Sequence, residues 1–208
     1  MSQRVPTEQE SFWQGNFGDA YVDRNCGQPL LASNLAFFSR ALQQVQGLGS
    51  VIELGANIGL NLQALGLLLP AVRRVGVEIN AKAHRTLAQL PGIEARLGSL
   101  LDVATDEQFD LALIKGVLIH QHPEMLPQAY AKLHALSARY VLIAEYYNPT
   151  PVEVVYRGEH GKLFKRDFAG EMLDRYPDLM LRDYGFIYHR DHLFPQDDMN
   201  WFLLEKRQ

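Results

Sequence analysis

The sequence predicts an α/β protein built on a mostly parallel sheet, and three observations support this prediction. Short apolar segments typical of buried strands alternate with segments of helical periodicity from Leu30 onward. A glycine-bearing turn follows the first of these strands, between Leu54 and Leu60. The second strand ends in an acidic residue, Glu78. This combination is typical of proteins that bind a ligand at the carboxyl ends of parallel strands.

The composition is that of an ordinary globular protein. The chain has 208 residues, 47% apolar and 21% charged, with a net charge of −4. It has no basic block that would favour nucleic acid and no apolar run as long as a membrane span. A single cysteine, Cys26, excludes an intrachain disulfide and a cysteine-based zinc site. We expect one domain over 1–208 and, because residues 1–10 lack the apolar core of a signal peptide, a cytoplasmic location.

The N-terminal region, 1–46, is predicted to be a cap followed by a helix. Residues 11–27 carry aromatic side chains between Gly, Asp and Asn, without a clear strand or helix period. Such a segment could close over a ligand through Tyr21 and Arg24, with the guanidinium pairing with a carboxylate. Alternatively, its aromatic residues only anchor the terminus to the core. The helix is predicted over 30–45 from apolar residues at helical spacing.

The central motif begins with a predicted buried strand, Val51–Leu54, and continues through a turn at Gly55, Asn57 and Gly59 into a helix over 60–69. Glycine lets a ligand approach the backbone closely, because no Cβ intervenes. The unpaired N–H groups of the helix N-terminus face the same place. The Gly-x-Asn-x-Gly spacing is a poor cradle for a pyrophosphate, which is bound by Gly-x-Gly-x-x-Gly. The alternative is an ordinary tight turn between strand and helix.

A second strand over 72–80 ends at Glu78. In nucleoside-binding α/β proteins, an acid at this position accepts hydrogen bonds from the ribose hydroxyls. A carboxylate suits this role because it offers paired acceptors to two vicinal hydroxyls. We therefore predict that Glu78 binds a ribose; the alternative is an acid that is merely solvated at the strand end.

The third strand is predicted over 93–97, after a helix over 82–90, and the fourth strand over 109–116. The fourth strand brings Lys115 and His120 to the edge of the sheet where ligands bind. His120 is a candidate base because the ordinary pKa of histidine lies near neutrality. The alternative is a histidine that only packs beside the ligand.

A helix opened by Pro123 and a fifth strand over 140–147 precede the segment 148–166, which leaves the sheet at its prolines. The segment is cationic in an otherwise acidic protein. We interpret it as a substrate loop suited to a phosphate or carboxylate; the alternative is a solvated surface loop. The substrate-binding residues predicted from this segment and its surroundings are Tyr147, Asn148, Tyr156, Arg157, Lys165, Arg166 and His189.

The C-terminal part begins with Asp167, which is suited to cap a helix that ends at Arg175. Strands over 179–189 and 199–204 follow without a helix between them, so we expect the last strand to run antiparallel. The connection 189–198 holds two histidines and three acids, but its hairpin spacing argues against a preformed metal cage. We predict a polar, solvent-facing turn and no metal.

Several segments together resemble the class I S-adenosylmethionine-dependent methyltransferases, and within them the methylases associated with pseudaminic acid biosynthesis. The segments that carry this resemblance are 53–61, 76–80, 115–120, 144–149, 163–173 and 184–191. The resemblance implies a Rossmann-like class I methyltransferase fold, with a seven-stranded, mostly parallel sheet, an antiparallel last strand and helices on both faces. It also implies S-adenosylmethionine as cofactor and a sugar or sugar nucleotide as acceptor. Asn57 departs from the family pattern, which usually has glycine there.

The resemblance also assigns roles to individual residues. In this family the residues after the third strand face the adenine, so Ser99 or the Leu100 backbone would contact the base; otherwise they form an ordinary turn and helix cap. The predicted cofactor-binding residues are Tyr21, Arg24, Glu53, Gly55, Ala56, Asn57, Gly59, Asn61, Glu78, Ile79, Ser99, Leu100 and Lys115.

Methyl transfer is an in-line displacement at a sulfonium, to which the protein contributes orientation and electrostatics. A hydroxyl acceptor must also lose its proton, whereas a carboxylate acceptor needs no base. The candidate bases are Glu145, Tyr146, His120 and His189. Glu145 is the first choice; alternatively it is a buried acid paired with Lys115 or Arg157.

We therefore predict an enzyme that methylates a small anionic metabolite and binds neither nucleic acid nor membranes. The alternatives are an enzyme that methylates a protein or peptide, and a non-catalytic module that binds S-adenosylmethionine.

Overall fold

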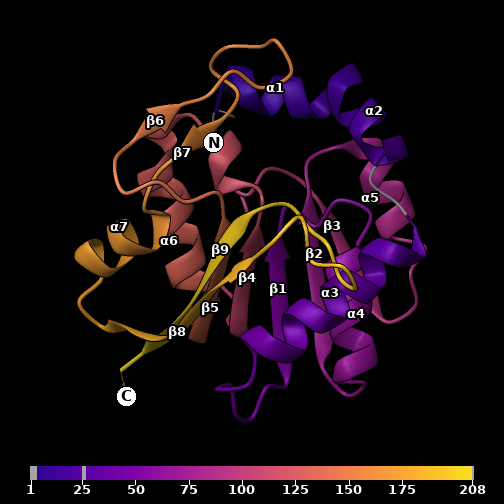
Figure 1. The fold of residues 1–208 in the computed structure, drawn as a ribbon, viewed down its shortest axis with the longest axis vertical. Helices are drawn as coiled ribbons and strands as arrows, with labels where there is room; N and C mark the ends of the chain where they lie inside the picture. Colours follow the sequence, from indigo (N-terminus) through magenta and orange to yellow (C-terminus); the bar gives the residue numbers. More distant parts are fainter. Residues whose placement is uncertain (1–3, 25–26, 208) are drawn as a thin grey trace.

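The computed structural model describes residues 4–24 and 27–207. The expectation that rests on Cys26 therefore lies outside the described residues. Within them, a seven-stranded sheet forms the centre of the molecule (Figure 1). Its strands are β1 (Ser50–Leu54), β2 (Arg73–Glu78), β3 (Ile93–Leu97), β4 (Phe109–Lys115), β5 (Ser137–Glu145), β8 (Leu179–Ile187) and β9 (Met199–Lys206).

The strand order is β3-β2-β1-β4-β5-β9-β8. The pairs β1–β2, β1–β4, β2–β3 and β4–β5 are parallel, whereas β9 runs antiparallel to both β5 and β8. The predicted antiparallel last strand is thus confirmed. The chain builds the sheet outward from β1 in one direction to β3 and then in the other direction from β4, so the switch point lies between β1 and β4. In open α/β sheets, ligands bind at this point.

Helices cover both faces of the sheet, as predicted. On one face, α3 (Gln28–Ala41) and α4 (Leu60–Leu68) pack against Val51, and α5 (Ala81–Leu87) lies beside β2 and β3. On the other face, α6 (Leu126–Leu136) and α7 (Phe168–Arg175) pack against residues such as Ile52. Because successive residues of a strand point to opposite faces, Glu53 lies on the same side as Val51, under α4.

The N-terminal segment predicted as a cap is helical, although its sequence shows no clear helical period. The helices are α1 (Glu8–Gln14) and α2 (Asn16–Arg24). A capping box fixes the start of α1: the Thr7 side chain accepts from the Glu10 N–H, and the Glu10 carboxylate accepts from the Thr7 N–H. This Thr-x-x-Glu spacing is visible in the sequence and could have indicated the helix.

The α1–α2 pair lies at one end of the sheet, together with β6 (Val152–Glu153) and β7 (Phe164–Lys165), as Figure 1 shows. The strands β6 and β7 form a separate antiparallel pair within the segment predicted as a substrate loop. Two short 3-10 helices, η1 (Leu118–His120) and η2 (Pro123–Met125), follow β4. None of the helices in the described part of the chain is long and apolar enough to cross a membrane.

Candidate functional site

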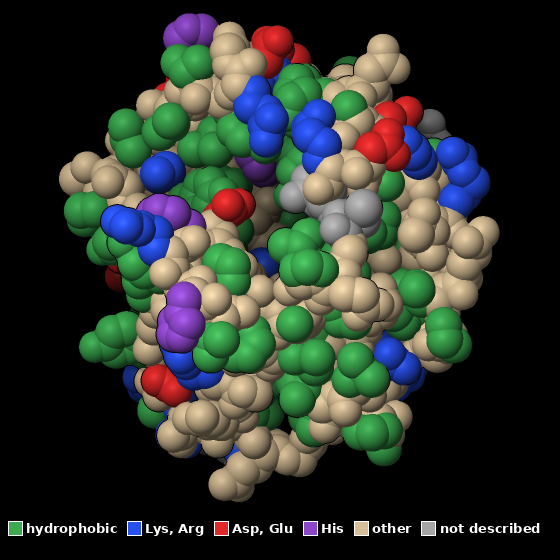
Figure 2. Space-filling view, turned by 45° about the vertical axis from the view of Figure 1, so that its right-hand side comes forward, with side chains coloured by type: hydrophobic (Ala, Val, Ile, Leu, Met, Phe, Trp, Pro, Cys, Tyr) green, Lys and Arg blue, Asp and Glu red, His purple; other side chains and the backbone are tan. Residues whose placement is uncertain are grey.

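A cavity of about 660 Å³ lies at the carboxyl ends of β1 to β4, beneath α1 and α2. Figure 2 shows a hollow in the molecular surface, surrounded by hydrophobic, charged and histidine side chains. Most of the residues predicted to bind the cofactor line this cavity: Tyr21, Gly55, Ala56, Asn57, Asn61, Glu78, Ile79, Ser99, Leu100 and Lys115. Glu53, Gly59 and Arg24 are not among the lining residues.

The turn after β1 explains why asparagine can replace the usual middle glycine. Gly55 has φ +80° and Asn57 has φ +48°, so both adopt the left-handed conformation. Asparagine tolerates this conformation better than most residues with a side chain. Gly55 is also sterically constrained, because an added Cβ would lie 2.5 Å from Val117 Cγ2. Asn57 therefore preserves the turn that the motif requires.

Glu78 lies at the end of β2 with its carboxylate held by the backbone. Its two oxygens accept hydrogen bonds from the N–H groups of Asn57, at 2.7 Å, and Asn80, at 2.6 Å. Burial raises the pKa of Glu78, and these N–H groups oppose that rise. Each oxygen keeps a further lone pair. The carboxylate is thus oriented and can still accept from a ligand in the cavity.

Glu53, Asn61 and Lys115 form a second polar region with incomplete hydrogen bonding. Asn61 Nδ2 donates to Glu53 Oε1 at 2.5 Å, while Glu53 Oε2 and Asn61 Oδ1 are buried and unpaired among the described residues. Burial raises the pKa of Glu53 to about 7 and lowers the pKa of Lys115. Within the described chain, the Lys115 ammonium has no hydrogen bond and lies 5.8 Å from the centre of the Phe37 ring. Buried polar groups are normally paired, so this region is suited to a polar ligand.

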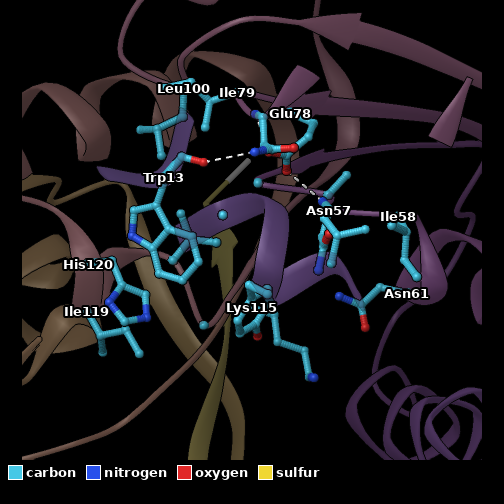
Figure 3. A pocket seen from close by; sticks show the side chains of 18 of the residues that line it. Trp13, Asn57, Ile58, Asn61, Glu78, Ile79, Leu100, Lys115, Ile119 and His120 are labelled. Carbon is cyan, nitrogen blue, oxygen red and sulfur yellow. Dashed lines mark hydrogen bonds between the residues drawn. The ribbon is translucent and has the colours of Figure 1, made fainter. Parts of the chain in front are cut away.

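The N-terminal helices close the cavity from above. Asn80 Nδ2 donates to the Trp13 carbonyl at 3.1 Å and to Asp19 Oδ1 at 2.9 Å, which ties both helices to the end of β2. Figure 3 shows the Trp13 ring beside His120, with Asn61 and Lys115 on the other side of the pocket. Arg24 is exposed, its guanidinium carbon lies 5.6 Å from the centre of the Phe17 ring, and it is not among the residues that line the cavity.

His120 lines the cavity as a neutral ring. Its Nδ1 lies 2.6 Å from the Lys162 carbonyl, which accepts from Nδ1–H, and burial lowers the pKa of His120 to about 4. The ring packs between Trp13 and Tyr156, with centroid distances of 4.7 and 5.0 Å. Such a ring can accept a proton only through Nε2.

Glu145 does not line the cavity, although it was the first choice of base. The side chain is 2% exposed, and one carboxylate oxygen accepts from the N–H groups of Val117, at 2.9 Å, and Leu118, at 2.8 Å. Its hydrogen-bond partners are therefore backbone groups after β4, while Lys115 acts on it only electrostatically. Burial raises the pKa of Glu145 to about 7. In this position the Glu145 carboxylate holds the backbone of Val117 and Leu118 behind the cavity.

The predicted cation cluster is dispersed. Arg157 lines the cavity, but Arg166 pairs with Glu171 of α7 at 2.5 Å, and Lys165 lies 5.3 Å from the centre of the Tyr146 ring. Lys162, also in this segment, pairs with Glu8 of α1. Of the residues predicted to bind substrate, Tyr156, Arg157 and His189 line the cavity, whereas Tyr147, Asn148, Lys165 and Arg166 do not. Cations that are neighbours in this segment therefore have different partners.

Several lining residues were missed. Gln9 and Glu10 belong to α1, whose capping box could have indicated them. Gln196 and Asp197 belong to the connection between β8 and β9, which was predicted to face solvent. No local pattern marks these two residues, because their position depends on where a long connection folds back.

The described residues, 4–24 and 27–207, hold no group of three or more His, Cys, Asp or Glu side chains arranged to bind a metal ion. In the connection considered for a metal, His189 pairs with Asp198 at 2.8 Å. These two exposed side chains of the loop are thus bonded to each other.

Comparison with known proteins identifies relatives in structure but not in sequence. No family model and no curated protein matches the chain. The 1,6-didemethyltoxoflavin-N1-methyltransferase of Burkholderia thailandensis, solved with S-adenosylhomocysteine, superposes with a TM-score of 0.74 at 15% identity, over 100% of this chain and 93% of that one. The magnesium protoporphyrin IX methyltransferase of Synechocystis gives a TM-score of 0.66 at 13% identity, over 98% and 100%.

The plantazolicin methyltransferase BpumL, in complex with a pentazolic desmethylPZN analog and S-adenosylhomocysteine, gives a TM-score of 0.63 at 14% identity, over 92% of this chain and 90% of that one. At identities this low, the superpositions establish the fold and nothing more. The chain has the Rossmann-like methyltransferase fold that the sequence predicted.

Proposed function

We propose that the protein is an S-adenosylmethionine-dependent methyltransferase. One observation carries this proposal: a single cavity is lined by an acid oriented for a ribose and, separately, by an unpaired amide oxygen of Asn61 and the ammonium group of Lys115, which suit an α-amino acid. S-adenosylmethionine is a nucleoside joined to an amino acid. A dinucleotide would instead need a cradle for pyrophosphate after β1, and the Gly-x-Asn-x-Gly turn is a poor one.

Each part of the cofactor has a candidate partner. Glu78 accepts from the ribose hydroxyls, and Ser99 and Leu100 contact the adenine. The ammonium of the amino acid binds near Asn61 Oδ1, and the Glu53 carboxylate, bonded to Asn61, supplies the opposite charge behind it. The carboxylate of the amino acid pairs with Lys115, whose ammonium group makes no hydrogen bond in the described chain.

The structural neighbours support the same assignment. The toxoflavin, protoporphyrin and plantazolicin methyltransferases were solved with S-adenosylmethionine or S-adenosylhomocysteine bound.

The bound cofactor would supply an activated methyl group, and the residues of this chain would hold the acceptor in line with it. Trp13, His120 and Tyr156 form an aromatic wall for that acceptor. His120 is neutral at pH 7, so it can accept a hydrogen bond or a proton at Nε2. Tyr146 keeps its proton, because burial and the neighbouring Asp197 both raise its pKa. Glu145 fixes the backbone of η1 and does not take part in proton transfer.

The acceptor is a small anionic metabolite. Arg157 carries a positive charge at the cavity, and no ion pair to it occurs among the described residues. A sugar or sugar nucleotide of a nonulosonic acid pathway is the member of this class that the sequence resemblance suggests. A ring with an apolar face could pack on the aromatic wall. A peptide acceptor is the second candidate, favoured by the likeness to the plantazolicin enzyme.

Calorimetry with S-adenosylmethionine, S-adenosylhomocysteine and NAD tests the proposal. We expect both sulfur compounds to bind and NAD not to bind. The Glu78→Ala variant should lose about 1–3 kcal/mol of cofactor affinity, because charge-assisted bonds to the ribose are removed. The control is Glu124→Ala, which removes a carboxylate that is 87% exposed and outside the cavity lining. Equal affinity in the two variants contradicts the ribose assignment, and absence of binding to the wild type contradicts the proposed function.

A further inference from the structure

The part of the cavity near Trp13 contains a cluster of aromatic rings from distant parts of the chain. Trp13 contacts Tyr21 with a centroid distance of 5.2 Å and His120 with a distance of 4.7 Å. Tyr156 extends the cluster beyond His120, and Tyr146 lines the cavity as well. These rings surround space that the proposed cofactor contacts do not use. We refer to it as the acceptor compartment.

Asp197 brings a carboxylate to the cavity beside this compartment. The Tyr146 hydroxyl donates to Asp197 Oδ2 at 2.8 Å, and Tyr146 follows β5 directly. This is the one hydrogen bond that Asp197 makes with side chains or backbone in 4–24 and 27–207. Lys115 acts on it electrostatically, but no cation there lies within ion-pair distance of it. Oδ1 is therefore available to a ligand, while the tyrosine holds the carboxylate in place.

The other carboxylates that line the cavity are already committed. Glu10 is bound by the guanidinium of Arg4, by the Ser99 hydroxyl and by the Thr7 N–H. Glu78 is bound by two backbone N–H groups. Asp197 differs from both, because one of its carboxylate oxygens, Oδ1, accepts no hydrogen bond from the described chain. That oxygen can accept the proton of a ligand hydroxyl.

The neighbouring Gln196 indicates independently that this connection binds a ligand. Gln196 lines the cavity, and both its amide nitrogen and its amide oxygen are buried without a hydrogen-bond partner in the described chain. Buried donors and acceptors in folded proteins are normally paired, because leaving them unpaired destabilises the folded state. A ligand with hydroxyl groups would satisfy both atoms, because a hydroxyl donates and accepts.

We propose that Asp197 is the general base of the reaction and that the acceptor group is a ring hydroxyl, with Gln196 binding a neighbouring polar group of the same acceptor. This inference rests on the proposed function. In the step, the acceptor oxygen forms a bond to the methyl carbon as the carbon–sulfur bond breaks. The electron pair of that bond goes to sulfur, and the hydroxyl proton goes to Asp197 Oδ1. Tyr146 is a positioning residue that orients the carboxylate.

The test uses the full chain, S-adenosylmethionine and four defined probes. N-acetylneuraminic acid, its cytidine monophosphate conjugate and 3,4-dihydroxybenzoate offer ring hydroxyls, and benzoate offers a carboxylate alone. Release of S-adenosylhomocysteine measures turnover. Treatment of the product with alkali distinguishes a methyl ether, which is stable, from a methyl ester, which is cleaved. We expect a methyl ether from at least one hydroxyl probe and no product from benzoate.

The decisive variant is Asp197→Asn, with Asp198→Asn as its matched control. Asp198 is the next residue in the chain but pairs with His189. For Asp197→Asn we expect kcat to fall on the order of 100-fold, as for loss of a general base, with cofactor affinity unchanged. Asp198→Asn should keep kcat within about threefold of the wild type, because the asparagine oxygen can still accept the hydrogen bond from the His189 backbone N–H. Tyr146→Phe, which keeps the ring but removes the donor, should lower kcat about tenfold.

Each result bears on the inference. A methyl ester product, a cofactor-binding enzyme that methylates none of the hydroxyl probes, or an Asp197→Asn variant as active as Asp198→Asn would each overturn it. If Asp197→Asn is unfolded, Tyr146→Phe decides, and unchanged kcat in that variant overturns the role of the pair. Absence of S-adenosylmethionine binding to the wild type is a different outcome, which contradicts the proposed function itself.

Discussion

The two ends of the cavity are built in different ways. The cofactor end is formed by residues that directly follow β1 to β4, such as Asn57 and Glu78, and their hydrogen bonds run mostly to nearby backbone. The acceptor end is assembled from α1, α2, the β6–β7 segment and the β8–β9 connection, which are far apart in the sequence. The strand ends thus provide a fixed frame, while long-range packing shapes the compartment where specificity is expected.

The largest expected effect tests the rigidity of the cofactor end. Gly55→Ala places a Cβ at φ +80° and 2.5 Å from Val117 Cγ2, so we expect a loss of about 2–4 kcal/mol in unfolding free energy, together with weaker cofactor binding. Urea denaturation and calorimetry measure the two quantities.

Gly47→Ala is the matched control for that variant. Gly47 has φ +67°, but nothing lies within 4 Å of an added Cβ. This variant should lose about 1 kcal/mol of unfolding free energy through backbone strain alone and keep its cofactor affinity. Similar losses of unfolding free energy in both variants would mean that contact between the added Cβ and Val117 does not destabilise the protein.

A second prediction concerns the proton on Glu53. Because burial raises the pKa of Glu53 to about 7, the group is about half protonated at pH 7 in the free protein. The ammonium of the cofactor favours the ionised form, so binding should release about half a proton at pH 7 and almost none at pH 9. Calorimetry in buffers of different ionisation enthalpy measures this release.

Two variants test whether Glu53 is the source of that proton. Glu53→Gln should abolish the release and weaken cofactor binding about tenfold to a hundredfold, because a charge-assisted bond is lost. Glu145→Gln should leave the release unchanged, although burial raises the pKa of Glu145 to about 7 as well, because that carboxylate is bound to backbone behind the cavity. Proton release that disappears in Glu145→Gln would assign the titration to the wrong acid.

The smallest expected effect sharpens the account of the acceptor end. Arg157→Ala should raise KM for an anionic acceptor about fivefold without changing cofactor affinity, because a solvent-exposed charge contributes modestly. Arg166→Ala should leave KM unchanged, since its guanidinium pairs with Glu171. Steady-state kinetics with the probe that the wild type methylates best separates the two, and a larger effect of Arg166 would restore the predicted cation cluster.

The difference between the cofactor end and the acceptor end of the cavity also explains how much of the structure could be predicted from the sequence. The sheet, its antiparallel last strand and the position of Glu78 follow from apolar patterning and from residues close to strand ends, which are local signals. Glu145 was misjudged because sequence alone did not show that its carboxylate faces the backbone of Val117 and Leu118. Asp197 was missed because a polar connection between strands gives no sign of where it folds.

The substrate segment shows the same limit. Its cations are neighbours in the sequence, but Lys162 and Arg166 pair with acids of α1 and α7. Those acids are 154 and five residues away, so one partner is distant and the other local. Only the local pair, Arg166 with Glu171 in the first turn of α7, could have been predicted from the spacing of the residues.

A crystal structure with S-adenosylhomocysteine bound tests the central claim most directly. We predict that the ribose hydroxyls lie within hydrogen-bond distance of the Glu78 carboxylate while the amino-acid carboxylate lies beside Lys115 Nζ. A ligand that occupies the cavity in the reverse orientation, or binds outside it, would contradict the claim that these two polar regions together recognise a nucleoside joined to an amino acid.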